Sequence, residues 1–324
     1  MSKNKEINSG RDSAAYDTRF KLTLCHPKYW GTWCLLAVMF LFSWMPVRWR
    51  DGLAKALAPV VLKLAQKPVA IARINLQICF PQLSVSEREQ LLYENIVSGL
   101  QSMLAFGEPT FRSKEYLLAR YTVTGWQHVE KLHEAGQPII FLMPHAWAVD
   151  MAGLYLSTHE YTMCTMMHSV PNKLYDWFIN RQRERFGGLV YERSAGLKPI
   201  IRNLKNSCNF FYLPDQDHGP EGSLFVDFFG RKKATLPALP KLCKLTGASV
   251  VPMFIAYDSA TSKYILEFLP ELENYPSGDI EADTLRMNQV IENMVSRYRS
   301  HYMWFLKYFR SRPDNNPERT YPRM

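Results

Sequence analysis

The stretch PIIFLMPHAWAVD, residues 138–150, joins an apolar run to a histidine and an aspartate. A short apolar run bounded by prolines predicts a buried strand, and Pro144 favours an extended residue before it and a turn after it. On a regular helix His145 and Asp150 would lie roughly 140° apart and could not meet. They can meet only if His145 lies in the turn before a helix. The spacing therefore raises the hypothesis of a histidine paired with a carboxylate at the end of a strand.

Beyond residue 138 the chain alternates between short runs rich in β-forming residues and stretches with helical character. Strands are expected at 138–143, 161–168, 188–192, 209–214, 249–257 and 263–270. Helices are expected at 146–158, 171–186, 197–206, 235–246 and near 281–300. This alternation predicts an α/β fold with a largely parallel or mixed sheet flanked by helices on both faces.

Three polar residues directly follow three of the expected strands. His145 follows FLM, Arg193 follows LVYE and Asp215 follows FFYLP. Ligands bind open α/β sheets at the carboxyl ends of the strands. If the strands are parallel, these three side chains lie on the same edge, and this coincidence is stronger evidence for a site than any one motif.

The N-terminal segment contains nineteen positions without a charged residue, from Tyr29 to Val47. As a helix this segment would extend roughly 28 Å, close to the thickness of the hydrocarbon core of a bilayer. A polar stretch precedes it and no small-residue cleavage site follows at once, so an uncleaved membrane anchor is favoured over a secretory signal. Its tryptophans suit either a spanning helix or one that lies in the membrane interface.

The chain is expected to divide into four parts. After the anchor, mixed apolar and basic positions predict helices, and SVSEREQ from Ser84 has the pattern of a capping box at a helix start. No internal repeat is evident. The parts are a polar N-terminal tail (1–28), a membrane-anchoring helix (29–47), a catalytic domain (51–312) and a basic C-terminal tail (313–324).

Composition limits the partners of the protein but does not select one. Its 324 residues carry a formal net charge of +9, which favours an acidic partner: nucleic acid, an anionic membrane or an acidic protein. Six cysteines stand singly, without a CxxC pair, and are interpreted as reduced core thiols rather than as a disulfide framework.

A histidine within hydrogen-bond reach of a carboxylate can act as a general base, because the carboxylate fixes the tautomer and stabilises the imidazolium. A helix cap or a core histidine is the simpler interpretation of His145. The sequence has no G-x-S-x-G and no phosphate-binding G-x-x-x-x-G-K-[ST], so direct attack by a substrate hydroxyl remains for such a pair. A metal site built on PDQDHG, residues 214–219, is a weaker alternative, since its carboxylates do not fit a Ca²⁺ loop.

Several motifs, taken together and in order, resemble a known family. They are PHAWAVD, RFGGLVYER, LPDQDHGPE, VDFF, KATLPAL and VVPMF, with HPKYWGTW and ARINLQICFP upstream. They occur in the order seen in the glycerolipid acyltransferase superfamily, and in detail they resemble its late lipid A acyltransferases. The resemblance covers most of the chain.

This resemblance implies an enzyme of the inner membrane, with its catalytic domain on the cytoplasmic side. Such an enzyme takes an acyl group from acyl carrier protein and adds it to a 3-hydroxyacyl group of a lipid A precursor, with no metal or organic cofactor. His145 and Asp150 match the family's H-x4-D catalytic pair, and Arg193 matches an arginine that contacts acceptor phosphate. Asp215 and Asp217 lie in a block that matches a substrate-binding segment, although PEGS at 220–223 resembles that segment more closely letter for letter.

Three other functions stay open at this stage. A metal-dependent membrane phosphoesterase and a non-enzymatic envelope scaffold are the alternatives to acyl transfer. Aromatic residues between the arginines of the C-terminal region could suggest base stacking on RNA, namely Tyr298, Tyr302, Trp304, Phe305 and Phe309. No RNA-binding signature accompanies them, so lipid or the acidic carrier protein is the expected partner, and not nucleic acid.

Overall fold

Seven strands form one mixed sheet in the computed structural model, which describes residues 15–159, 161–313 and 320–322. Their order across the sheet is β1-β9-β8-β2-β5-β3-β4. The bounds are Tyr121–Thr124 (β1), Ile139–Leu142 (β2), Met163–Met167 (β3), Leu189–Glu192 (β4), Asn209–Tyr212 (β5), Ser249–Asp258 (β8) and Lys263–Phe268 (β9). All neighbouring strands are parallel except β8 and β9, which are antiparallel.

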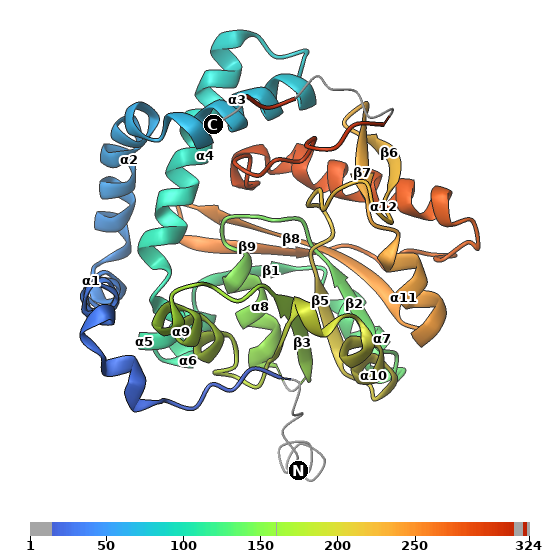
Figure 1. Cartoon of the computed structure of the whole chain (residues 1–324), viewed down its shortest axis with the longest axis horizontal. Coiled ribbons are helices and arrows are strands. Elements are labelled where there is room, and N and C mark those ends of the chain that lie inside the picture. Colours follow the sequence, from blue (N-terminus) through green and yellow to red (C-terminus); the bar gives the residue numbers. More distant parts are fainter. Residues whose placement is uncertain (1–14, 160, 314–319, 323–324) are drawn as a thin grey trace.

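Helices cover both faces of this sheet (Figure 1). The crossovers from β2 to β3 and from β3 to β4 run in one direction, and those from β4 to β5 and from β5 to β8 run in the other. Because such crossovers are right-handed, α8 and α9 lie on one face and α10 and α11 on the other, where α12 packs against α11. These helices are Val149–Thr158 (α8), Lys173–Arg183 (α9), Lys198–Lys205 (α10), Ala238–Thr246 (α11) and Ile280–Arg297 (α12).

The predicted α/β architecture is confirmed, and each predicted strand and helix after residue 138 is present. The sequence reading missed strand β1 and the antiparallel hairpin of β6 and β7, Leu224–Phe228 and Arg231–Thr235, which packs against α12. It also missed the short helices Glu108–Phe111 (α5), Lys114–Leu118 (α6) and Trp126–Glu134 (α7). These elements are short and lack the periodicity that identifies longer ones.

The expected membrane-anchoring helix at 29–47 is shorter in the structure. Helix α1 covers Trp30–Trp44 and ends there because Met45, which precedes Pro46, is extended. The chain then starts α2, Val47–Leu64, followed by α3, Gln66–Cys79, and α4, Val85–Ala105. Within the described parts of the chain, no helix combines the length and the apolar character needed to cross a bilayer.

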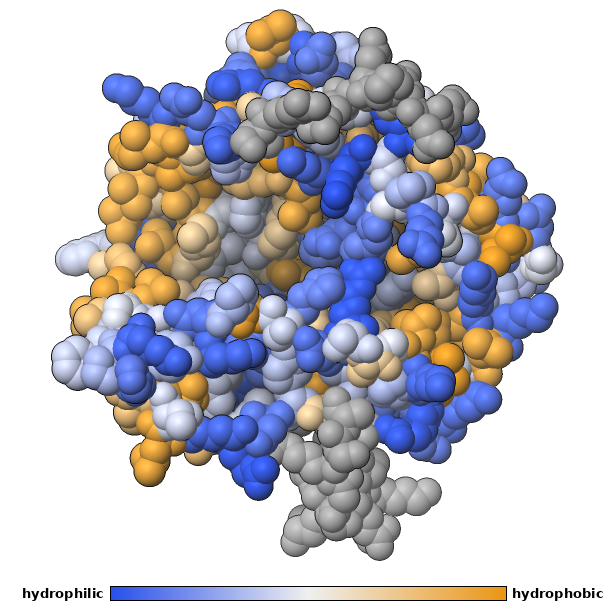
Figure 2. Space-filling model, viewed as in Figure 1, coloured by the Kyte–Doolittle hydropathy of each residue, from blue (hydrophilic) through white to orange (hydrophobic). Residues whose placement is uncertain are grey.

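Large apolar side chains are nevertheless exposed along α1 and α2. Figure 2 shows hydrophobic surface at the left edge of the molecule, where Figure 1 places these two helices. The most exposed side chains are Leu41 at 67%, Trp49 at 71% and Leu64 at 75%. Monomeric proteins seldom expose large contiguous apolar patches without a partner, so this surface is a candidate binding face.

Buried charges hold α2 against the rest of the domain. The guanidinium groups of Arg50 on α2 and of Arg120 both donate to the carboxylate of Glu108, and all three side chains are buried. Tyr116 Oη donates to the same carboxylate at 2.8 Å. Because removing one partner would leave an uncompensated buried charge, this cluster fixes the position of α2.

The predicted tails pack on the domain where the structure describes them. Ala15 pairs with Tyr191 on β4, and Trp177 Nε1 donates to the carbonyl oxygen of Thr18 at 3.0 Å. Near the C-terminus, Tyr321 is buried and its hydroxyl donates to Asn75 Oδ1 at 2.6 Å. The remainder of both predicted tails, 1–14 and 314–319 with 323–324, lies outside the described residues.

The burial of the cysteine and aromatic side chains tests two expectations from the sequence. Four cysteines are buried free thiols, as expected, but Cys25 and Cys34 are exposed on the N-terminal segment. Tyr302, Trp304 and Phe309 are buried in the main core, so these rings are not available to stack on nucleic-acid bases.

Candidate active site

His145 lies just beyond the carboxyl end of β2 and is paired with a carboxylate from the neighbouring strand. Its Nδ1 lies 2.5 Å from Oδ1 of Asp215, which follows β5, and its backbone N–H donates to Oδ2 of the same carboxylate at 2.8 Å. Asp215 is fully buried, whereas the imidazole is 20% exposed. The parallel pairing of β2 with β5 places both residues at one edge of the sheet.

The hydrogen bonds of the imidazole define which nitrogen carries the proton. Burial opposes ionisation of Asp215, but the His145 ring, its two hydrogen bonds and the charge of Lys233 lower the pKa of this carboxyl below its ordinary value. The ionised carboxylate only accepts, so Nδ1 of His145 donates. Nε2 is then left with a lone pair, which accepts from Nε2 of Gln216 at 3.1 Å. An imidazole held in this way presents a basic nitrogen that can take a proton from a hydroxyl, provided that the hydroxyl replaces the Gln216 amide.

A segment from the end of the chain holds this pair in place. Tyr302 Oη donates to Oδ2 of Asp215 at 2.8 Å. The backbones of Ala146 and Tyr302 form an antiparallel bridge, in which Met303 N–H donates to the carbonyl of His145 at 2.8 Å. Both ends of the imidazole–carboxylate pair are therefore positioned by residues about 160 positions further along the chain than His145.

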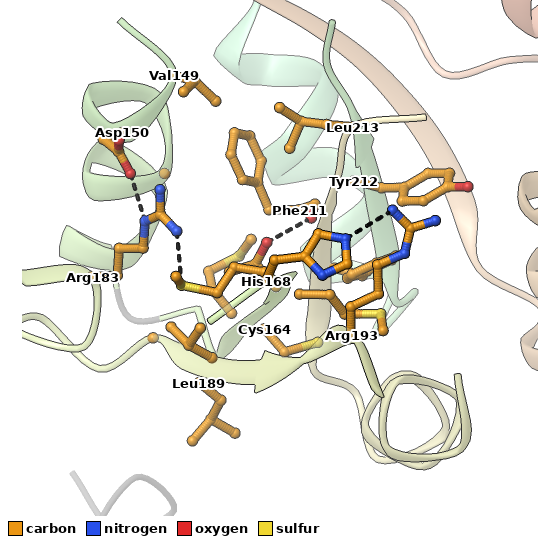
Figure 3. A pocket seen from close by; sticks show the side chains of 18 of the residues that line it. Val149, Asp150, Cys164, His168, Arg183, Leu189, Arg193, Phe211, Tyr212 and Leu213 are labelled. Carbon is orange, nitrogen blue, oxygen red and sulfur yellow. Dashed lines mark hydrogen bonds and ion pairs between the residues drawn. The ribbon is translucent and has the colours of Figure 1, made fainter. Parts of the chain in front are cut away.

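Asp150 is not the partner of His145 in the structure. It lies in the first turn of α8 and accepts from Nε of Arg183 on α9 at 2.6 Å, while Nη1 of Arg183 reaches Sδ of Met167 at 3.0 Å (Figure 3). His145 does lie in the turn before the helix, as its predicted role requires, but the ring points to the end of β5. Asp150 and His145 still border the same cavity.

Asp217 holds the backbone of the loop that carries Asp215. Its carboxylate accepts from the backbone N–H of Ser311 at 2.6 Å, from the Ser311 hydroxyl at 2.8 Å and from the N–H of Gly219 at 2.9 Å. Neither Asp215 nor Asp217 lines the cavity, so the structure places these two expected substrate contacts behind the His145 ring.

Arg193, after β4, lies at the edge of the cavity between two histidines. Its Nη1 lies 3.1 Å from both ring nitrogens of His218 and 3.5 Å from Nε2 of His168. Burial and the neighbouring charges of Arg193 and Lys233 lower the pKa of His218 to about 4. Among the described residues, Arg193 has no carboxylate within ion-pair distance, so this corner carries uncompensated positive charge.

An apolar cavity of about 490 Å³ opens beside the imidazole. Figure 3 shows Asp150 and Arg183 on one side of it and His168 and Arg193 on the other. Side chains of α8 and of strands β3, β4 and β5 form the wall, including Val149, Leu154, Met163, Cys164, Met167, Leu189, Phe210 and Phe211. A cavity of this size with a few polar groups at its mouth is typical of a small-molecule or lipid-chain site.

The alternative of a metal centre was based on Asp215, Asp217 and His218. Within the described parts of the chain, no three His, Cys, Asp or Glu side chains converge as a metal site requires. In the structure these groups contact His145, Ser311 and Arg193 instead.

Comparison with known proteins identifies the family. Residues 17–311 match the family model described as bacterial lipid A biosynthesis acyltransferase. The chain belongs to this family. It is an acyltransferase of lipid A biosynthesis, which confirms the resemblance seen in the sequence.

Individual relatives align with the acyltransferase along nearly its whole length. It is 37% identical to a lipid A biosynthesis acyltransferase of Haemophilus influenzae, covering 97% of this chain and 98% of the relative. It is 34% identical to the lipid A biosynthesis myristoyltransferase of Escherichia coli, covering 94% and 95%. Among solved structures, the 1-acyl-sn-glycerophosphate acyltransferase PlsC of Thermotoga maritima matches with a TM-score of 0.37 and 14% identity, covering 79% of this chain and 99% of PlsC.

Sequence reasoning missed four side chains of the acyltransferase site. Gln216 stands inside the quoted motif LPDQDHGPE, but its amide had no assigned role. Arg183 stands in the basic run RQRER, residues 181–185, which had no assigned role, and Tyr302 was considered only among the aromatic residues of the C-terminal region. Lys233 belongs to KATLPAL, and nothing in the sequence indicated that its side chain is buried.

Proposed function

We propose that this acyltransferase moves a fatty acyl chain from acyl carrier protein to the hydroxyl of a 3-hydroxyacyl group on a lipid A precursor. One observation carries the proposal: Nε2 of His145, held by Asp215, opens on an apolar cavity that has Arg193 at its edge. The apolar cavity can hold an acyl chain, the imidazole can accept a proton from a hydroxyl, and the guanidinium can bind a phosphate.

In this mechanism the acceptor hydroxyl replaces the amide of Gln216 at Nε2 of His145. The hydroxyl oxygen attacks the thioester carbonyl carbon while Nε2 takes its proton, and the new C–O bond forms as the C–S bond breaks. A thiol with a pKa near 8.5 is an adequate leaving group, and the thiolate finally receives the proton from the imidazolium. Asp215 stabilises that imidazolium without being protonated itself. Asp150 contributes in a different way, because its ion pair keeps Arg183 at the cavity wall.

An assay with defined substrates tests the proposal. Purified protein is given acyl carrier protein thioesters of several chain lengths and under-acylated lipid A, and the mass added to the lipid is measured. We expect acyl transfer that EDTA does not affect. The KM for the acyl carrier protein donor should rise with salt, because salt screens the charges on the two proteins. Activity lost in EDTA and restored by metal would support the phosphoesterase, and unaltered lipid would overturn acyl transfer to lipid A.

Arg193 is proposed to bind a phosphate of the acceptor. Its guanidinium presents a planar set of donors and has no ion-pair partner among the described residues, and phosphate is the anion that this geometry matches. His168 and His218 lie on either side of it, so a bound phosphate would also be within reach of the two rings.

The variant Arg193→Gln is expected to lower kcat/KM for the acceptor by about 10- to 100-fold, since hydrogen bonds to charged groups contribute about 1.5–3 kcal/mol. Arg181→Gln, on the exposed end of α9, is the control and should be near wild type. An acceptor without its phosphate should react equally with both proteins. If the donor KM changes instead, the phosphate that Arg193 binds belongs to the carrier's prosthetic group.

The exposed apolar faces of α1 and α2 are proposed to lie in the interface of the inner membrane. Three tryptophans on these helices are exposed, Trp30, Trp44 and Trp49, and tryptophan favours the boundary between headgroups and acyl chains. Basic residues Arg48, Lys55 and Lys63 are exposed on α2, where anionic headgroups would attract them. This arrangement would place the catalytic domain at the surface on which its lipid acceptor lies.

Replacing Leu41, Trp49 and Leu64 together by serine is expected to weaken binding to vesicles of phosphatidylethanolamine and phosphatidylglycerol by at least about tenfold, because each apolar side chain contributes about 1.5–3 kcal/mol when fully buried. The control replaces Leu245 and Ile280, which are exposed on other helices, by serine. Cosedimentation with vesicles measures the binding. Equal binding of the triple variant and the control would place the membrane contact elsewhere.

A further inference from the structure

The apolar cavity extends from His145 along the sheet, and the topology defines its far end. Strands β2, β3, β4 and β5 are parallel, so their carboxyl ends lie together near His145. Helix α8 connects the end of β2 to the start of β3 and therefore runs back along the strands. Figure 3 shows Val149 and Leu213 on one side of the cavity and Cys164 and Leu189 on the other. Residues late in α8 and early in β3 and β4 thus lie farthest from the imidazole.

Three residues of the cavity wall meet at this far end, and we call them the floor: Ser157, Met163 and Gly188. Ser157 lies in the last turn of α8, Met163 begins β3, and Gly188 directly precedes β4. Cys164 pairs with Leu189 in the sheet. The residues that precede this pair, Met163 and Gly188, therefore lie side by side. A Cβ atom added to Gly188 would lie 3.4 Å from Oγ of Ser157, which brings α8 to the same place.

Backbone geometry gives the distance from the mouth of the cavity to its floor. Met163 and Met167 are the first and last residues of β3, and their separation corresponds to about 13 Å of strand. Asp150 and Ser157 lie at opposite ends of α8, separated by about 10 Å of helix. Both elements place the floor at a similar depth. An acyl chain whose carbonyl carbon lies at His145 therefore points its terminal methyl group at the floor.

The floor is closed by backbone and by side chains that are already packed. A Cβ atom added to Gly188 would lie 2.9 Å from the backbone oxygen of Arg183, so the end of α9 packs directly behind this glycine. The hydroxyl of Ser157 donates to the carbonyl of Gly153 at 2.9 Å, and Met163 is 3% exposed. A chain longer than the cavity would have to displace main chain, which a densely packed interior resists.

We propose that Ser157, Met163 and Gly188 select the length of the acyl chain that the enzyme transfers. A chain that just reaches the floor buries all of its methylene groups, and each of them contributes about fourfold in affinity. A shorter chain gives up part of this contribution, and a longer one cannot bring its carbonyl carbon to His145. The inference rests on the proposed function, in which the acyl chain of the donor occupies this cavity.

Two variants of the floor are expected to change the preferred chain length in opposite directions. Ser157→Leu fills the floor and should favour donors shorter than the wild-type optimum, whereas Met163→Ala deepens it and should favour longer ones. For two donors that differ by two methylene groups, the ratio of kcat/KM values should change by about tenfold. The measurement is a competition among acyl carrier protein thioesters of several lengths, read as the mass added to under-acylated lipid A.

A third variant tests whether the position along α8 determines the size of the effect. Gly153 lines the cavity one helical turn nearer to His145 than Ser157 does. A Cβ atom at this position would lie 3.6 Å from the ring of Phe211, which is an ordinary contact, so a side chain can enter the cavity here. Gly153→Leu should therefore favour still shorter donors than Ser157→Leu.

Met253→Ala is the matched control, because Met253 is a buried methionine on β8 outside the cavity wall. It should keep the chain-length preference of the wild type even if it unfolds at a lower temperature. If Met163→Ala does not fold, Met163→Val makes the same test with a smaller loss of volume. Active Ser157→Leu and Gly153→Leu proteins with the wild-type preference would overturn the inference. Absence of transfer by the wild type from every thioester would instead contradict the proposed function.

Discussion

Replacing His145 by alanine is expected to lower kcat for acyl transfer by about 10²- to 10⁴-fold, the usual loss when a general base is removed. The donor KM should change little, because the apolar wall of the cavity stays intact. The ring is partly exposed at the cavity, so its removal should not prevent folding. Rates with the acyl carrier protein donor, together with a thermal unfolding curve, measure both effects.

The control for this experiment is His128→Ala on α7, a histidine outside the cavity wall. It should retain wild-type activity. If His145→Ala retained near-normal acyl transfer, His145 would be only a structural residue at the start of α8. The proposed mechanism would then be wrong.

The variant Asp215→Asn is expected to lower kcat by a similar factor, about 10²- to 10⁴-fold. The asparagine amide can donate to Nδ1 of His145, and this favours the tautomer that carries its proton on Nε2. That tautomer has no lone pair for the hydroxyl proton. Combining Asp215→Asn with His145→Ala should be little worse than His145→Ala alone, because the two residues act as a unit.

Asp150→Asn provides the decisive comparison for this pair. Its carboxylate holds Arg183, so its loss should reduce activity, but the effect should add to that of His145→Ala. The opposite pattern, in which Asp150 couples to His145 and Asp215 does not, would show that the five-residue spacing defines the working pair during catalysis. Double-mutant cycles in kcat/KM distinguish the two patterns.

The architecture was predictable because its elements are local in sequence. Runs such as residues 249–257 are β-rich and end at turn residues, and the stretches between strands have helical spacing. The rule for parallel strands then placed His145, Arg193 and Asp215 on one edge without any knowledge of side-chain contacts. All three lie around the cavity mouth or directly behind it.

The pairings were not predictable because they depend on the path of loops. Asp150 is five residues from His145, whereas Asp215 is 70 residues away and is brought to the ring by the parallel pairing of β2 and β5. Lys233 follows Lys232 in a short hairpin, where lysines are usually solvated, but its side chain is fully buried in the folded domain. The length of α1 was overestimated because an uncharged run was treated as one helix through Pro46.

The bridge between Ala146 and Tyr302 has a consequence for the synthesis of the protein. Chains fold from the N-terminus while they are being made, so α1, α2 and most of the sheet are available before residue 302 leaves the ribosome. Until then Asp215 lacks the Tyr302 hydroxyl, and the backbone of His145 lacks its partner Met303. The hydrogen-bonded arrangement around the imidazole–carboxylate pair is therefore completed only after the C-terminal segment has been made, however early the rest of the sheet folds.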